Sequence, residues 1–505
     1  MNKKRIQLLF GNVSAFLRDA MASSWFWRVM IVLFVLQAVY LALVGRYAMA
    51  FDEQFHFAAI QEYARVLLPW QITQPPGPAE LSAFTADGSY LYHYLASWPY
   101  RLTAFITDSQ TAQIIVLRLM DVGIVTVGLY VYRRLLLLLG LPRAAAHVIL
   151  ALVMLMPMTP WLAGQLTYDA PFMTLCGVTM LALFKLVRAI SVRRTIPLVP
   201  AAWSVSLLLI TAQVKYAFLP VVLGASVYVL ALIVLQLKRR RISWPAVQQS
   251  WRQTMSLGSG TLAVGVLLLS GVFFMQRYGM NVVQYGTPVP SCNTVLGHER
   301  CLGFGPYGRD ARIHSEGWYE TISTQNKLGY PKIWFDKMVY ESYFAVGPLE
   351  TGYSTKKPLP VPYTIGKALA LFGVLVLVFR FVWLIRRGPQ AQLALVIVAA
   401  YVLALFAVNF KAYLYTAIPV TIHGRYVLPF LPLAGYLVYM AVRPLLRTRR
   451  LKQAATVLAA LAVLGSAWGG GIGAWTIGAN DDWHWPNARP ATHVVRDITE
   501  KIVLQ

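Results

Sequence analysis

The stretch FWRVMIVLFVLQAVYLALVGRYAMAFDEQFHF, residues 26–57, places a long apolar run before two adjacent carboxylates and a histidine. The run is long enough to cross a bilayer as a helix, which takes about 20 residues. Asp52, Glu53 and His56 therefore lie where the chain is predicted to leave the membrane. Because only 20 of the 505 residues are acidic, a pair here indicates a functional site. The alternative is a solvated helix start, where the helix dipole favours acidic side chains.

The composition is that of an all-α polytopic membrane protein. Apolar residues make up 57% of the chain and charged residues 13%, and the mean hydropathy is +0.55. The net charge of +25 would suit nucleic acid, but the Arg and Lys clusters lie between apolar runs. That placement is typical of topology signals and of contacts with anionic lipid headgroups. We therefore expect membrane lipids, and no nucleic acid, as partners.

Apolar segments of about twenty residues predict about eleven transmembrane helices. They are residues 26–49, 113–138, 144–163, 170–189, two segments within 197–237 with a break near 211–216, 256–276, 364–385, 390–408, 424–442 and 454–475. The predicted organisation has four parts: an N-terminal transmembrane module (1–276), a large loop (277–363), C-terminal transmembrane helices (364–475) and a tail (476–505).

Basic clusters predict the orientation of these helices. Cytoplasmic loops carry an excess of Lys and Arg, and the clusters here are Arg133-Arg134, Arg188 with Arg193-Arg194, Lys238–Arg241, Arg386-Arg387 and Arg443–Lys452. If these clusters lie in the cytoplasm, the other side of the membrane carries the segment 51–112, the loop 277–363, the turn 409–423 and the tail. The break near 211–216 is decisive because the loss of one span would invert everything after it.

The predicted outer segments are rich in aromatic residues and hold two of the three cysteines. The aromatic residues of 51–112 fit helices lying in the membrane interface, or a platform on which sugars stack; they include Trp70, Tyr90, Tyr92, Tyr94, Trp98 and Tyr100. Cys292 and Cys301 share one outer loop, where an oxidising compartment permits a disulfide. Cys176 is expected to be buried in the fourth apolar segment.

Charged residues at the outer ends of apolar runs suit transfer of a sugar from a lipid phosphate. Such a transfer needs a carboxylate to take the acceptor's proton and cations to hold the leaving phosphate. Asp52 and Glu53 are the candidate carboxylates, and Lys215 and Arg425 are the candidate cations. Lys215 could instead extend to the headgroups, whereas the planar guanidinium of Arg425 suits bidentate phosphate binding.

Other polar residues leave alternatives open. Asp169 begins the fourth apolar segment, where it can cap a helix or orient a metal or an acceptor hydroxyl. Arg118 and Asp121, three residues apart, are predicted to pair with each other. No metal is predicted because tight ligand spacing is missing; a divalent cation remains the alternative, with Asp52, His56 and His93 as its ligands.

Three short motifs resemble those of the GT-C superfamily of polyprenyl-phosphate-sugar glycosyltransferases. This superfamily includes relatives of the protein O-mannosyltransferases and of the aminoarabinose transferases of lipid A. Asp52-Glu53 with His56 matches the DE-x-x-H form of its first-loop signature. The segment 167–169 resembles the second-loop acidic motif, without the asparagine that often precedes the acid. Gly424-Arg425-Tyr426 with Pro429 resembles the G-R-Y-x-x-P of the bacterial branch catalogued as domain of unknown function 2142.

The resemblance implies a GT-C-like fold and an inverting transfer at the outer face of the bacterial cytoplasmic membrane. The donor would be a polyprenyl-phosphate sugar, and the acceptor a cell-envelope glycan, a lipid or a protein. Asp52 would be the base, with Glu53 beside it; the predicted substrate-binding residues are His56, Asp169, Lys215, Arg425 and Tyr426. The alternatives are a transporter or flippase for a lipid-linked glycan and a non-catalytic assembly protein. Charges gathered at one interface, without a visible internal repeat, favour the enzyme over the transporter.

Overall fold

The computed structural model describes residues 3–504 except for 194, 240–241, 243, 256–257 and 349–353. The all-α prediction is confirmed for this part of the chain. The strands described there are a short antiparallel pair, β1 (Ala345–Val346) and β2 (Thr355–Lys356).

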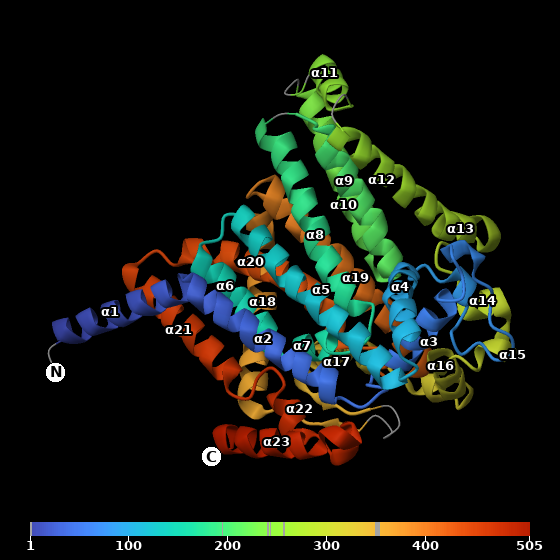
Figure 1. Ribbon diagram of the computed structural model, residues 1–505. Helices are drawn as coiled ribbons and strands as arrows, with labels where there is room; N and C mark the ends of the chain where they lie inside the picture. Colours follow the sequence, from blue (N-terminus) through green and yellow to red (C-terminus); the bar gives the residue numbers. More distant parts are fainter. Residues whose placement is uncertain are drawn as a thin grey trace.

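The long helices form one bundle (Figure 1). In chain order they are α2 (Ser24–Val44), α5 (Gln110–Leu138), α6 (Arg143–Leu155), α8 (Asp169–Arg188), α9 (Leu198–Val214), α10 (Leu219–Lys238), α12 (Gly258–Phe274), α18 (Pro360–Ile385), α19 (Pro389–Thr416), α20 (Leu431–Val442) and α21 (Arg449–Ala467). Among the described residues, 8 helices are long and apolar enough to cross a membrane; α6 and α9 are shorter, and α21 is not among the eight. The chain is a multi-pass membrane protein, and the predicted number of spans stays a prediction.

The other helices lie at the ends or on the sides of this bundle. They are α1 (Lys3–Ala22), α3 (Glu53–Tyr63), α4 (Leu91–Ile106), α7 (Met158–Ala163), α11 (Trp244–Met255), α13 (Met280–Tyr285), α14 (Cys292–Leu296), α15 (His298–Cys301), α16 (Gly305–Ser315), α17 (Thr324–Tyr343), α22 (Gly473–Gly478) and α23 (Arg489–Val503). Figure 1 shows α3, α4 and α13–α16 together at one end of the bundle, on the right of the view. We call this the site end.

The basic clusters that predict the orientation lie near the C-terminal ends of α5, α8, α10, α18 and α20, and the last of them extends into α21. Three of their members, Arg194, Arg240 and Arg241, lie outside the described residues. The assignment of the site end to the outer face of the membrane stays a prediction.

Close packing of α5 against α8 sets the position of the site. A Cβ added at Gly128 of α5 would lie 2.4 Å from Oγ1 of Thr174 on α8, and one added at Gly177 would lie 3.2 Å from the ring of Tyr132. Only glycine allows such an approach of helices. The start of α8 is therefore held beside α5.

One predicted helix end agrees with the structure and another differs from it. The break expected near 211–216 is present, with α9 ending at Val214 and a short 3-10 turn, η4 (Tyr216–Phe218), following Lys215. By contrast, α19 continues to Thr416, past the predicted end at residue 408. The polar Asn409 is accommodated inside the helix because its side chain accepts from Trp334 Nε1 at 2.9 Å and donates to Thr421 O at 3.0 Å.

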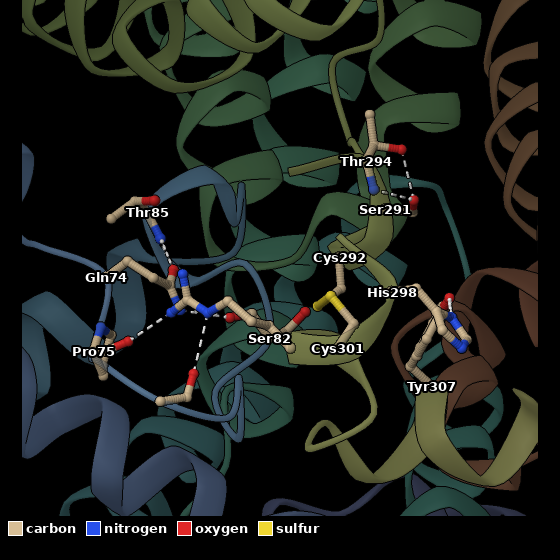
Figure 2. The surroundings of a disulfide bond; sticks show 12 residues. Gln74, Pro75, Ser82, Thr85, Ser291, Cys292, Thr294, His298, Cys301 and Tyr307 are labelled. Atoms are coloured by element: carbon tan, nitrogen blue, oxygen red, sulfur yellow. Dashed lines mark hydrogen bonds between the residues drawn. A yellow bond between two sulfur atoms is a disulfide. The ribbon is translucent and has the colours of Figure 1, made fainter. Parts of the chain in front are cut away.

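The large loop is attached to the first outer segment. A disulfide joins Cys292 of α14 to Cys301 of α15, with the two Cα atoms 5.8 Å apart. Figure 2 shows it next to the segment that contains Pro75. Arg300 donates to the carbonyl oxygens of Gly77, at 3.1 Å, and Pro75, at 3.0 Å. The disulfide therefore supports the contact between the loop and the segment 72–90.

Candidate functional site

The two adjacent acids of the first outer segment face different surroundings. Asp52 is the N-cap residue of α3 and has a φ of +75°, and Phe51 before it has a φ of +63°. Left-handed residues other than glycine are strained, and such strain concentrates at functional sites. The side chain of Asp52 is 47% exposed, whereas Glu53 is fully buried.

Glu53 lies in the core, which corrects its assignment as a catalytic residue. Its two oxygens accept from Nε and Nη2 of Arg118, each at 2.7 Å. The backbone amides of Met49 and Leu166 also donate to this carboxylate, at 2.7 and 2.9 Å, and Arg118 Nη1 donates to Gly45 O at 2.6 Å. A carboxylate has about four acceptor positions, and the protein occupies them all. Glu53 therefore ties α3 to α5 and to the turn before α8.

The predicted pair between Arg118 and Asp121 is wrong. Arg118 turns to Glu53, and Oδ2 of Asp121 instead accepts from the Tyr92 hydroxyl at 2.7 Å and from Thr167 N at 3.2 Å. Both partners come from elements distant in sequence, so the local spacing did not reveal them. Asp121, like Glu53, positions the turn before α8.

The aromatic residues of the first outer segment divide into two groups. Tyr90 and Tyr92 are buried, and the Tyr90 hydroxyl donates to Gln213 Oε1 at 2.9 Å. These two tyrosines therefore hold α4 in place and are not free to stack on a sugar. Trp70 and Trp98 are each 45% exposed.

Arg425 bridges two acids that are far apart in the sequence. It lies in the 3-10 turn η8 (Gly424–Phe430) and is 3% exposed. Its Nη2 donates to Asp52 Oδ2 at 3.2 Å, and its Nη1 donates to Phe51 O at the same distance. Its Nε lies 3.6 Å from Asp169 Oδ2, and Nη2 also lies 3.4 Å from the Tyr426 hydroxyl. One guanidinium thus fixes Asp52, Asp169 and the strained turn.

Lys215 completes this group from the break between α9 and α10. Its Nζ donates to Asp169 Oδ1. It also lies over the rings of Tyr168, Phe172 and Tyr426, at 4.9, 5.5 and 4.4 Å from their centroids, an arrangement that stabilises a cation. Because Lys215 is only 4% exposed, the alternative that it extends to the headgroups is wrong.

Asp52, Asp169, Lys215 and Arg425 form what we call the charge cluster, with two acids and two cations. It borders a cavity that is lined in part by Asp169 and Arg425. The volume of this cavity is about 10 Å³, which is enough for about one water molecule. Within the described residues, Asp169 Oδ2 and Arg425 Nε have no hydrogen-bond partner. A phosphate or a sugar is too large for this cavity, so such a ligand must meet the cluster from the exposed side of Asp52.

His56 is packed behind the charge cluster rather than exposed to a substrate. It is 2% exposed, its Nδ1 lies 2.9 Å from His93 Nε2 and its Nε2 lies 3.4 Å from Thr167 Oγ1. Burial lowers the pKa of both histidines well below its usual value, and the charges of Arg425 and Lys215 add to this at His56. The pair is therefore neutral and links α3, α4 and the turn before α8. We revise the predicted substrate-binding role of His56 to one of positioning.

A second polar pair, absent from the sequence prediction, lies next to Arg425. His423 Nδ1 is 2.5 Å from Glu341 Oε2, and the imidazole ring lies 4.7 Å from the Phe51 ring. Burial lowers the pKa of His423, while Glu341 acts in the opposite direction. Glu341 belongs to α17 in the large loop, which no motif covered. Gly424 approaches this helix closely, since a Cβ added at Gly424 would lie 2.1 Å from Ser342 Oγ. This approach brings His423 next to Glu341.

No group of three or more His, Cys, Asp or Glu side chains placed to hold a metal ion occurs among the residues that the structure describes.

No protein family and no curated protein matches this chain. Among solved structures it is similar to ArnT from Cupriavidus metallidurans bound to undecaprenyl phosphate, with 14% identity and a TM-score of 0.43 over 95% of this chain and 71% of that one. The apo state of ArnT aligns with 14% identity and a TM-score of 0.40 over 95% and 73%. The oligosaccharyltransferase of Archaeoglobus fulgidus, tethered with an acceptor peptide, aligns with 12% identity and a TM-score of 0.42 over 90% and 56%.

ArnT and the oligosaccharyltransferase are members of the GT-C superfamily, which the sequence motifs resemble. The nearer relation to the branch catalogued as domain of unknown function 2142 has no match and stays a prediction.

Proposed function

We propose that this chain is an inverting glycosyltransferase of the GT-C type. It moves a sugar from a polyprenyl-phosphate donor to an acceptor hydroxyl at the outer face of a bacterial cytoplasmic membrane. The observation that carries the proposal is the charge cluster, in which residues 52, 169, 215 and 425 meet at the site end of an apolar bundle. Buried ionisable groups in a membrane protein are costly and mark sites of function.

Asp52 is the general base in this proposal because it is the most exposed acid of the cluster. Its side chain is 47% exposed, compared with 4% for the side chain of Asp169 and 0% for that of Glu53. Asp169 faces two cations, Lys215 and Arg425, and serves to hold them in place. Arg425 orients Asp52 through the 3.2 Å contact between Nη2 and Oδ2.

Charge balance explains why the base and the cations belong together. The cluster is neutral as a whole, and a polyprenyl-phosphate sugar brings one negative charge on its phosphodiester. As the acceptor oxygen bonds to the anomeric carbon, its proton passes to Asp52 and the bond from that carbon to the phosphate oxygen breaks. Asp52 loses its charge while the leaving phosphate gains one. Arg425 therefore transfers its interaction from Asp52 to the phosphate in the transition state, where such stabilisation accelerates the reaction.

The positions of the charges also favour an enzyme over a transporter. Transporters hold substrate and coupling ions near the middle of the bilayer. Here Asp169 begins α8, Lys215 follows the end of α9 and Arg425 precedes α20. All three therefore lie at helix ends and not in the middle of a long apolar helix.

The test is transfer from a radiolabelled polyprenyl-phosphate sugar pool in membranes that contain Asp52→Asn. This substitution is nearly isosteric and removes the ability to take a proton, and loss of a general base typically lowers the rate about a hundredfold to ten-thousandfold. We expect donor binding to persist. Glu62→Gln is the matched control, because Glu62 lies on the same helix in a surface pair with Arg65 at 2.9 Å. Full activity of a folded Asp52→Asn variant would contradict the proposal.

A further inference from the structure

The last helix, α23 (Arg489–Val503), carries an apolar ridge that its own chain does not cover. Val494, Ile498 and Ile502 recur every four residues and so lie along one face of the helix. Their exposed fractions are 59%, 54% and 59%. We call these three residues the α23 ridge.

Polar contacts on another face hold α23 to the segment before it. Arg489 Nε donates to Asp481 O at 3.0 Å, and Arg496 Nη1 donates to Ala479 O at 3.4 Å. His493 Nε2 lies 2.8 Å from Asp481 Oδ1, and Thr492 is 2% exposed. The polar residues thus make the intramolecular contacts, and the ridge is turned away from them.

The end of α23 lies where two bundle helices end. Trp468, the C-cap residue of α21, donates from Nε1 to Val503 O at 3.3 Å. A Cβ at Gly469 would lie 2.7 Å from Cδ1 of Leu359, the N-cap residue of α18, and 3.0 Å from Cγ1 of Val503. Figure 1 shows α23 lying across the lower end of α21 and beside α22.

The side of the bundle next to α23 is itself apolar and exposed. Of the candidate spans, α18 has the fewest buried residues in its apolar window. Its outward side chains near the start include Val361 and Leu369, 46% and 39% exposed, and further along the helix Phe379 is 81% exposed. A helix of this composition that crosses a bilayer is covered by lipid tails. The end of α23 lies beside the start of this helix, because Val503 and Leu359 both approach Gly469.

We propose that α23 lies on the membrane surface and inserts its ridge among the lipids of the leaflet at the site end. Amphipathic helices bind in this manner through an apolar face with basic residues at its border. Lys501 is exposed beside the ridge and can extend its ammonium to lipid phosphates. Trp468, 52% exposed, has the amphipathic ring that favours the same depth.

Anchoring α23 in the membrane also restricts the motion of residues 44–46, which precede Asp52. Trp485 N donates to Val44 O at 3.0 Å, and Arg46 N donates to Trp483 O at 2.9 Å. The tail before α23 thus pairs with residues just upstream of the strained turn. The proposal does not depend on catalysis, and its test uses no substrate.

The test is nitroxide accessibility in the full chain reconstituted into vesicles of phosphatidylethanolamine and phosphatidylglycerol. The cysteines suit this design, because Cys176 is buried and the other two form the disulfide. Nitroxides are placed through Val494→Cys, Ile498→Cys and Ile502→Cys, each alone. Phe379→Cys on α18 is the lipid-facing control and Glu316→Cys in the large loop is the water-facing control.

At the ridge we expect high accessibility to oxygen and low accessibility to a nickel chelate, as at Phe379. A label introduced by Asp497→Cys, on the border of the ridge, should be more accessible to the nickel chelate. Nickel accessibility at the ridge as high as at Glu316 would place the ridge in water and overturn the proposal. Low accessibility to both reagents would show a covering protein surface, such as a second copy of this chain, and would overturn it equally.

Discussion

Replacing Glu53 with Gln should destabilise the protein strongly, although the change is nearly isosteric. Glu53 and Arg118 are both 0% exposed, and their two contacts of 2.7 Å form a bidentate pair. Removing one member leaves the guanidinium buried without its counter-charge. Such a loss costs about 3–5 kcal/mol, which is roughly a hundredfold to several-thousandfold in the folded-to-unfolded ratio at about 1.4 kcal/mol per factor of ten.

The chain contains its own probe for this measurement. Cys176 is its one free thiol, is fully buried and lies on α8. A thiol-reactive fluorophore therefore reports exposure of the bundle core as the detergent-purified protein is heated or treated with denaturant. We expect Glu53→Gln to expose Cys176 at a clearly lower temperature and denaturant concentration than the parent does.

Two further variants make the comparison specific. Glu62→Gln breaks a surface pair whose arginine, Arg65, is 72% exposed, so its effect should be within about 0.5 kcal/mol. The double variant Glu53→Gln with Arg118→Leu removes the orphaned charge, and it should recover part of the loss. A single Glu53→Gln variant as stable as Glu62→Gln would refute the structural role assigned to this pair.

Three more predictions follow from the same geometry. Arg425→Lys loses the planar guanidinium that contacts Phe51 O and Asp52 together, so the rate of sugar transfer should fall by about a hundredfold. Cys176 should remain unreactive, which shows that the variant is folded. Near-normal transfer would show that any cation can replace Arg425. Serine at both Cys292 and Cys301, nine residues apart, should lower the free energy of unfolding by about 2.5 kcal/mol through loop entropy, measured by proteolysis of the large loop; an unchanged cleavage rate would contradict this. Burial lowers the pKa values of His56 and His93, so below about pH 6.5 the unfolded state binds protons that the folded state does not. As the pH falls below this value, the free energy of unfolding should therefore decrease by up to about 1.4 kcal/mol per pH unit for each histidine. A variant with Asn at both positions should lack this slope.

Local sequence patterns predicted the features that depend on local physics. The long apolar runs located the helices because bilayer thickness fixes their length. The break near 211–216 is predicted because polar residues interrupt an apolar run there, and the helices separate at Lys215. A helix also separates neighbouring side chains by about 100°, so two adjacent acids such as Asp52 and Glu53 point in different directions. The structure adds which of them faces outward.

Partners distant in sequence could not be predicted in this manner. Arg118 has an acid three residues away, yet it binds Glu53, 65 positions away in the chain. The helical period predicts which side chains share one face of a helix. Their partners depend on the element that packs against that face. Glu341 was missed for the same reason, since α17 meets His423 through a contact 82 positions apart. Such long-range pairs require the packing of the whole bundle.

The four residues of the charge cluster all lie where a helix starts, stops or changes. Asp52 is the residue before α3, Asp169 is the first residue of α8, Lys215 separates α9 from η4 and Arg425 lies in η8. Within a regular helix the backbone groups bond to each other, but at interruptions they are free to bind side chains. The bond from Arg425 to Phe51 O uses such a group. Helix interruptions at one depth thus let an apolar bundle hold four charges together without placing any of them in the middle of a span. A polar residue at the break of an apolar run is therefore a better indicator of a membrane site than a charge alone.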